Sequence, residues 1–105
     1  MSETLTILIP VWNEEEAIPG VVQEILSLPE ARDYRILLIN DGSTDRTAEV
    51  IDGLAARDPR VSTLHRPHQG KDHALWAGLA AAPGDWLGMT DGDGQYDPRD
   101  FARLL

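Results

Sequence analysis

Cysteine is absent from this sequence of 105 residues. Disulfide bonds, cysteine-ligated zinc sites and thiol catalysis are therefore excluded. Long apolar runs are absent too, since no stretch approaches the roughly 20 residues that a membrane-spanning helix needs. The segment Met1–Thr4 has neither the basic nor the apolar region of a secretory signal. These absences predict a chain without a transmembrane segment that works in the cytoplasm.

Basic residues are scarce. Nine lysines and arginines stand against eighteen aspartates and glutamates, which gives a formal net charge of −9. Nucleic acid is excluded as a partner because its backbone requires a basic surface. A nucleoside diphosphate would also be repelled unless a metal ion bridged it to the protein. The charge balance therefore favours a metal-dependent phosphate site over a clamp of arginines and lysines.

Four short apolar runs alternate with segments whose apolar residues follow helical spacing. The runs cover residues 5–9, 34–39, 61–64 and 86–89, and the helical spacing covers 18–26, 48–55 and 74–79. The first two runs are rich in aliphatic residues, as in parallel strands that are covered on both faces. This order predicts one domain, residues 1–105, with an α/β fold and a doubly wound, mostly parallel sheet in the order βαβαβαβ(α).

Local signals refine this prediction. Asn13 precedes three glutamates and is expected to be the N-cap of the first helix. Ser43 or Thr44 is expected to cap the second helix, and Pro98 to begin a last short one. The methionines and tryptophans other than Trp12 are expected to pack in the core.

Polar residues follow three of the predicted strands, in the segments Pro10–Glu16, Asn40–Asp45 and Asp91–Gln95. Loops at the carboxyl edge of a parallel sheet converge, so we expect these segments to line one crevice. Simpler interpretations remain for two of them. Residues 13–16 could only cap a helix, and Asp41-Gly42 could only form a turn.

Asp91 and Asp93 lie one residue apart, directly after an apolar run. Paired carboxylates of this kind predict a site for a hard divalent cation, Mg²⁺ or Mn²⁺, that keeps positions open for substrate phosphates. A calcium loop of the EF-hand type is excluded. That loop needs glycine at its sixth and glutamate at its twelfth position, where this chain has Tyr96 and Ala102.

Histidine is the remaining metal ligand to consider. The sequence has three, and a structural or solvent role is favoured over a zinc site because no cysteine assists them and they fall on different elements. They are His65, His68 and His73.

Taken together, several segments resemble the family 2 inverting glycosyltransferases. They are Pro10-Val11-Trp12-Asn13-Glu14-Glu15, Asn40-Asp41-Gly42-Ser43-Thr44-Asp45, Gly70-Lys71, Gly84-Asp85, Asp91-Gly92-Asp93-Gly94-Gln95 and Pro98. The resemblance runs from Leu5 to the end and is strongest to the dolichol- or polyprenyl-phosphate sugar transferases, which have the GT-A fold. It implies a UDP- or GDP-sugar donor, Mg²⁺ or Mn²⁺ as cofactor, and an acceptor such as a polyprenyl or dolichyl phosphate.

The resemblance also implies roles for individual residues. Donor-binding residues would contact the base, the ribose or the phosphates, with Asp41 accepting a hydrogen bond from a base N–H. They are Pro10, Trp12, Glu14, Ile39, Asp41, Lys71, Asp91, Gly92 and Asp93. The metal bridging the diphosphate would be held by Asp91, Asp93 and Gln95.

The sequence departs from the family pattern at two places. Trp12 stands where such enzymes often have tyrosine, and His68 where they commonly have asparagine. In addition, the family's general base and acceptor-binding elements lie well beyond the Asp-x-Asp loop, so no catalytic residue is assigned. We therefore expect residues 1–105 to be a nucleotide-sugar-binding subdomain truncated at its C-terminus, which would self-associate through an exposed sheet edge.

Three functional hypotheses remain open from the sequence. The first is a glycosyltransferase domain, located in the cytoplasm or, for a full-length protein, peripherally at the cytoplasmic face of a membrane. The second is a catalytically incomplete half-domain that binds nucleotide and metal without turnover. The third is a regulatory domain on the same scaffold, because a fold does not imply a function.

Overall fold

Strands and helices alternate along the chain as the apolar pattern predicts. The computed structural model describes residues 5–29, 34–81 and 86–89. The strands are β1 (Leu5–Val11), β2 (Tyr34–Asp41), β3 (Val61–Arg66) and β4 (Trp86–Met89). The helices are α1 (Ile18–Leu26), α2 (Thr47–Arg57) and α3 (Lys71–Ala81). The helix predicted at Pro98 and the segment Asp91–Gln95 lie outside the described residues.

The first three strands run about two residues further than the sequence predicts. Pro10 belongs to β1, Asn40 and Asp41 belong to β2, and His65 to β3. Residues expected in loops therefore sit on the last positions of rigid strands. This holds their side chains more firmly than a loop would.

The described strands form one parallel sheet in the order β3-β2-β1-β4. The chain builds outward from β1 to β3 and then returns to place β4 on the other side of β1. Ile7 accordingly pairs with Ile36 on one side and Gly88 on the other. The reversal of strand order beside β1 is the point where open α/β sheets bind ligands, at the carboxyl ends of the strands.

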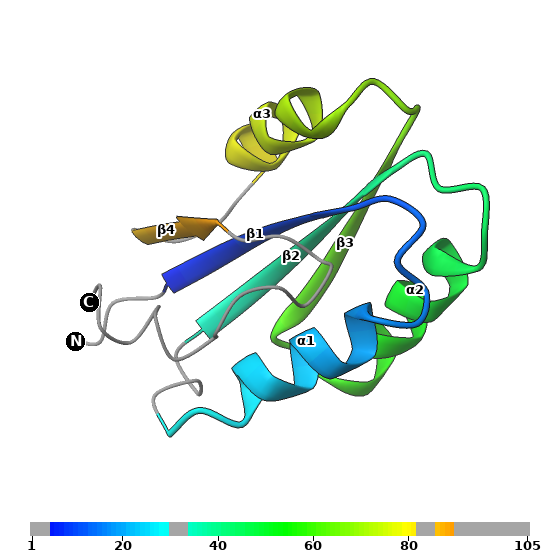
Figure 1. The fold of residues 1–105 in the computed structure, drawn as a ribbon. Helices are drawn as coiled ribbons and strands as arrows, with labels where there is room; N and C mark the ends of the chain where they lie inside the picture. The colour runs from blue at the N-terminus through cyan, green and yellow to red at the C-terminus, as the bar shows by residue number, and fades with distance from the viewer. Residues whose placement is uncertain (1–4, 30–33, 82–85, 90–105) are drawn as a thin grey trace.

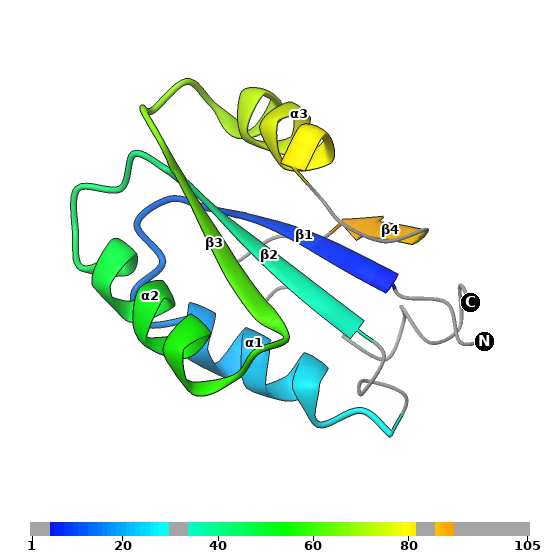
Figure 2. The same cartoon turned by 180° about the vertical axis from the view of Figure 1, so that it is seen from behind.

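Both faces of the sheet are covered. Helices α1 and α2 lie on one face and α3 lies on the other (Figures 1 and 2). Alternate residues of β1 serve the two layers: Ile7 and Ile9 pack with α1, whereas Leu8 packs with Ala74 of α3. This two-sided burial explains why β1 and β2 are continuous aliphatic runs.

Helix α3 approaches the sheet closely at Gly78. A Cβ atom there would lie 2.5 Å from Cδ1 of Ile39 and 3.4 Å from Cδ2 of Leu8. The missing side chain therefore lets α3 pack directly on Ile39, one of the predicted donor-binding residues, which is fully buried.

The predicted helix caps are wrong. Helix α1 begins at Ile18, five residues after Asn13, and neither α1 nor α2 has a side-chain hydrogen bond from its N-cap residue. Asn13 adopts a φ of 52°, in the left-handed region, so it is not part of a right-handed helix. Its side chain and those of Ser43 and Thr44 bond to each other's loops instead. The side chains that would have capped the helices form hydrogen bonds between loops instead.

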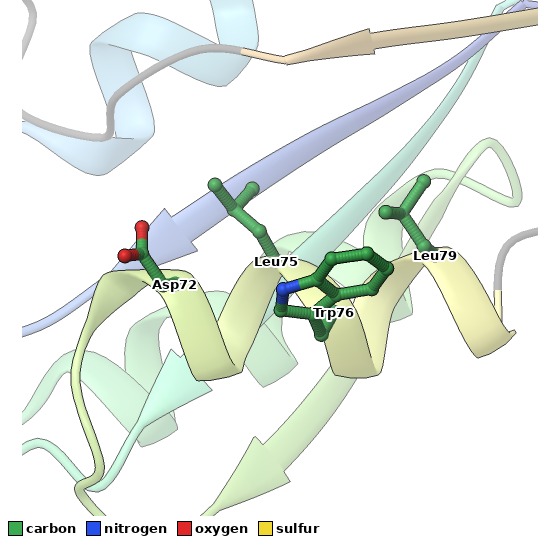
Figure 3. Close-up of a pocket in the computed structure, with 4 residues that line it drawn as sticks. All are labelled: Asp72, Leu75, Trp76 and Leu79. Carbon is green, nitrogen blue, oxygen red and sulfur yellow. The ribbon is translucent and has the colours of Figure 1, made fainter.

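Trp76 was expected to pack in the core, and this prediction is wrong because its side chain is 72% exposed. Ala74 and Gly78 lie four residues apart and face the sheet, so Trp76, two residues from each, points the opposite way. With Asp72, Leu75 and Leu79 it lines a pocket of about 200 Å³ on α3 (Figure 3). The side chains of the methionines and of Trp86 lie outside what the structure describes.

Candidate functional site

Three loops leave the carboxyl edge of the sheet in the described part of the chain. Loop 1 (residues 12–17) follows β1, loop 2 (42–46) follows β2 and loop 3 (67–70) follows β3. Side chains from each loop or strand end hold the next one. The predicted convergence of the first two polar segments is therefore confirmed, and loop 3 joins them.

Asn13 ties loop 1 to loop 2. Its backbone N–H donates to the Ser43 hydroxyl at 3.0 Å, and its side-chain oxygen accepts from the Thr44 N–H at 2.8 Å. The side-chain amide also donates to the Thr44 hydroxyl at 3.1 Å. The positive φ of Asn13 turns the chain so that backbone and side chain can make these bonds together. The left-handed region is one that asparagine tolerates better than most residues.

Glu14 is held by the next contact along the same loops. Its backbone N–H donates to the hydroxyl of Thr47, at 2.9 Å, and that hydroxyl donates to Asp45. Partial burial alone would raise the pKa of Asp45. Hydrogen bonds from the Thr47 hydroxyl and from the N–H groups of Thr47, Glu15 and Asp45 outweigh it and hold this pKa below its usual value. Asp45 therefore remains an ionised acceptor just before the first turn of α2.

Asp41 ties β2 to loop 3. Its side chain is almost fully buried, and its carboxylate accepts the N–H of Gln69 at 2.9 Å and that of Gly70 at 3.0 Å. Nδ1 of His68 lies 3.0 Å from the same carboxylate and 3.0 Å from the Asp41 carbonyl oxygen. Gly70 directly precedes α3, so the negative charge also faces the positive end of that helix dipole.

Gly42 allows loop 3 to approach. A Cβ atom at Gly42 would lie 2.4 Å from the backbone nitrogen of His68, and the φ of Gly42 is 68°. A backbone atom cannot move aside as the end of a flexible side chain can. Glycine is thus required here on both steric and conformational grounds.

Trp12 and His68 close the group of loops. Their rings stack with centroids 5.0 Å apart and planes inclined by 28°. Both remain accessible, because Trp12 is 47% exposed and the side chain of His68 is 55% exposed. An aromatic surface is therefore presented to solvent where three loops meet.

A second chain of hydrogen bonds runs outward from the buried amide of Asn40. The amide oxygen accepts the Ser43 N–H at 3.0 Å, and the amide nitrogen lies 3.1 Å from Nδ1 of His65. The other ring nitrogen of His65 lies 2.9 Å from Asp52. The hydrogen bond from His65, aided by one from the Thr63 hydroxyl, holds the pKa of Asp52 below its usual range.

The structure brings together part of the predicted donor site. Trp12 and Glu14 lie in loop 1, Asp41 lies at the end of β2, and Lys71 is the exposed first residue of α3, next to the Gly70 that Asp41 binds. The buried residues Pro10 and Ile39 are register partners just below these loops. Pro10 lies beyond Leu8, the last partner of β4, so its missing N–H costs the described β1–β4 ladder nothing.

Four of the predicted residues lie outside the described part of the chain: Asp91, Gly92, Asp93 and Gln95. Strand β4, which precedes them, ends at Met89 beside Leu8 of β1. Within the described residues, no group of three or more histidines, aspartates or glutamates could hold a metal ion. Within the same residues, no helix is both long and apolar enough to cross a membrane.

The sequence reasoning missed His68 and Thr47 as members of this site. Thr47 is fully buried and bonds to loop 1, although the sequence places it inside a helical segment. His68 was noted only as a departure from the family pattern. Its position shortly after the third predicted strand was the available signal, because that strand also ends at the carboxyl edge.

Comparison with known proteins agrees with this geometry. The sequence model described as "Glycosyl transferase family 2" matches residues 6–105. The chain is 42% identical over 97 residues to a prophage bactoprenol glucosyl transferase homolog of Escherichia coli, covering 90% of this chain and 31% of that protein. It is 35% identical over 108 residues to a dolichyl-phosphate beta-glucosyltransferase of Trichomonas vaginalis, covering 95% and 33% respectively. The chain thus spans about a third of the length of the curated relatives it matches.

Solved structures show the same fold. A mannosyltransferase from Pyrobaculum calidifontis, in complex with GDP-Man and Mn²⁺, superposes with a TM-score of 0.84 at 25% identity, covering 97% of this chain and 31% of that one. A glucosyl-3-phosphoglycerate synthase from Mycobacterium tuberculosis, in complex with Mn²⁺, UDP and its product, gives 0.70 at 26% identity, covering 87% and 34%. These likenesses confirm the predicted GT-A fold. Because the family model matches nearly its whole length, the chain belongs to glycosyl transferase family 2.

Proposed function

We propose that this chain is the nucleotide-sugar-binding part of a glycosyltransferase. It binds a UDP- or GDP-sugar through Mg²⁺ or Mn²⁺, for transfer to an acceptor such as a polyprenyl or dolichyl phosphate. The observation that carries the proposal is the interlocked group of loops at the carboxyl edge of β1–β3. This group presents Trp12, Glu14 and Asp41 beside the strand-order reversal.

The hydrogen bonds of the Asp41 carboxylate support a role in base binding. An ionised carboxylate can accept about four hydrogen bonds. Asp41 accepts from Gln69, Gly70 and His68, which leaves capacity for a base N–H. Because the existing donors fix the carboxylate, little ordering is needed when a base arrives.

The metal belongs to the other end of the proposed site. Asp91, Asp93 and Gln95 supply the oxygen ligands that Mg²⁺ and Mn²⁺ prefer, and a bound ion would neutralise the diphosphate as it departs. In a chain of net charge −9, the nucleotide needs such a bridge. The relatives solved with Mn²⁺ support this choice of ion.

Calorimetry tests the proposal. We expect UDP or GDP to bind in the presence of Mn²⁺ or Mg²⁺ and to lose measurable binding when a chelator removes the ion. Asp93→Ala should abolish the metal dependence, whereas Glu24→Ala, which removes an exposed acid of α1, should leave binding unchanged. Equal nucleotide affinity with and without the chelator would refute the proposed metal bridge.

A second candidate is a half-domain that binds nucleotide and metal without turnover. It is favoured by the fact that every residue assigned above serves the donor, while displacement at a sugar carbon also needs a base positioned for the acceptor. Transfer of radiolabelled sugar from UDP- or GDP-sugar to polyprenyl phosphate distinguishes the two. Multiple turnover by the 105-residue chain would reject the second candidate.

A further inference from the structure

The roles assigned so far to Trp12 and His68 do not explain why their rings stack. Both residues depart from the family pattern that the rest of the sequence resembles. The structure stacks their rings with centroids 5.0 Å apart. The contact joins residues 56 positions apart in sequence, from the loops after β1 and β3.

The His68 ring is fixed by more than stacking. Its Nδ1 lies 3.0 Å from the Asp41 carbonyl oxygen and 3.0 Å from the Asp41 carboxylate. Both neighbours are acceptors, so Nδ1 carries the hydrogen and donates it. Gly42 presses against the backbone of His68 from below, and loop 3 is anchored through Gly70. The ring therefore has a defined orientation although more than half of the side chain is exposed.

A fixed and exposed aromatic pair at this edge is suited to a flat ligand. The two rings already contact each other, so a planar group would stack on an outer face of the pair and not between them. One face of Trp12 is covered by His68, which holds the indole in place. A flat ligand would therefore stack on the opposite face of this half-exposed residue. Stacking of a base on an aromatic ring tolerates any base, because every base has a π-face.

The sheet order assigns the pair to one end of a bound nucleotide. Loop 3 follows β3 and the predicted metal ligands follow β4, at the opposite edge of the order β3-β2-β1-β4. Neighbouring strands lie about 4.8 Å apart, so the edges are separated by roughly 14 Å. Trp12 follows β1, beside β4, but its ring stacks on His68 from the β3 edge. A nucleotide whose diphosphate reaches the loop after β4 would therefore have its base, and not its phosphates, near His68 and the Trp12 ring that stacks on it.

We propose that His68 is a base-positioning residue. It stacks on Trp12 and donates to Asp41, so that both are held in one arrangement for the nucleobase of the donor. This inference rests on the proposed function, since it concerns the same nucleotide site. In this proposal His68 contributes to nucleotide binding by fixing the Trp12 ring. That contribution is separate from the hydrogen bond to Asp41, which anchors loop 3.

Two substitutions separate these contributions. His68→Asn keeps an N–H donor in nearly the position of Nδ1, and so keeps the bond to Asp41, but it removes the ring. His68→Phe keeps the ring on Trp12 and removes the donor, while Gln69 and Gly70 still hold Asp41. His73→Asn is the matched control, because His73 is exposed on α3 and lies outside the three loops.

Calorimetry with UDP, GDP and inorganic pyrophosphate, each with Mn²⁺, gives the test. We expect His68→Asn to weaken both nucleotides about tenfold, because Trp12 then loses the ring that fixes it as the stacking surface for the base. His68→Phe should stay within about threefold of the parent, and pyrophosphate should bind equally to all variants. If His68→Asn is unfolded by circular dichroism, His68→Gln also removes the ring while leaving Trp12 in place, and it should give the same loss.

The outcomes are distinguishable. Unchanged nucleotide affinity in His68→Asn would overturn the inference, because the bond to Asp41 alone would then account for His68. A loss that also extends to pyrophosphate would overturn it too, since the effect would reach beyond the base. A parent chain that binds neither UDP nor GDP with Mn²⁺ would instead refute the proposed function, and this inference with it.

Discussion

Gly78 provides a direct test of how closely α3 packs on the sheet. The substitution Gly78→Ala adds one methyl group, which would lie 2.5 Å from Cδ1 and 3.2 Å from Cγ1 of Ile39. Ile39 is fully buried and belongs to the core layer under α3, so it has little room to move. Gly53→Ala in α2 is the matched control, because nothing lies within 4 Å of a Cβ atom there.

Two opposing effects determine the magnitude. Alanine is favoured over glycine by about 1 kcal/mol in the interior of a helix, and this gain applies to both substitutions. Overpacking a filled core costs about 1–3 kcal/mol, and this cost applies only at Gly78. We therefore expect Gly53→Ala to stabilise the chain by about 1 kcal/mol. Gly78→Ala should range from neutral to destabilising by about 2 kcal/mol.

Urea unfolding followed by far-UV circular dichroism measures both variants, with free energies extrapolated linearly to water. The informative quantity is the difference between the two substitutions, because the gain in helix propensity cancels. If Gly78→Ala proved as stabilising as Gly53→Ala, α3 would not contact Ile39 as described. Helix α3 would then not hold Ile39, a predicted donor-binding residue, in place.

Three further predictions concern the loops. Gly42→Ala should destabilise the chain by more than about 1 kcal/mol and weaken nucleotide binding, because it combines a positive φ with a clash against His68; urea unfolding and calorimetry check it. Asn13→Ala should weaken nucleotide binding while α1 stays intact by circular dichroism, since Asn13 joins loops and does not cap the helix. Asp52→Asn should cost stability near neutral pH, and this cost should disappear in acid. The pKa of Asp52 is lowered by His65, so its stabilisation is full above the unfolded value, about 3.9, and is lost as pH falls through the folded value, which pH-dependent urea titrations would show.

The sequence was sufficient for the elements and their order. Continuous aliphatic runs predicted β1 and β2 as parallel strands covered on both faces, and both proved to be buried on two faces. These predictions succeeded because burial from both sides favours a nearly continuous aliphatic run, which is a pattern that is visible locally. The strand ends were less accurate: Pro10 and Asp41 are polar-loop residues by composition, yet the ladder between β1 and β2 continues to Val11 and Asn40.

The capping predictions failed for a reason that the sequence does not contain. Asparagine, serine and threonine favour helix caps because they bond to nearby backbone groups. In this fold, Asn13 and Thr44 find each other across 31 positions of sequence, and the same preference for backbone N–H groups is met between loops. Only the parallel pairing of β1 with β2 places the two loops side by side, so local rules could not distinguish the outcomes.

Trp76 and His68 show the same limit in opposite directions. Trp76 was expected in the core from its residue type, but the small residues Ala74 and Gly78 take the sheet-facing side of α3. The sequence marked His68 only as a departure from the family pattern, but loop 3 turns it onto Trp12. In both cases the decisive fact is which side of an element faces a neighbour.

The arrangement of the loops has a consequence for the order of binding. The described contacts that hold Trp12, Glu14 and Asp41 come from residues before α3 ends, and none requires the segment after β4. These described contacts already hold the three residues at the proposed base end. Preorganised groups recover more of the interaction energy on binding, because less ordering has to be done.

A nucleoside alone should then bind weakly without metal, whereas the diphosphate adds a metal-dependent increment. Charge repulsion in a chain of net −9 would otherwise oppose that second half of the ligand.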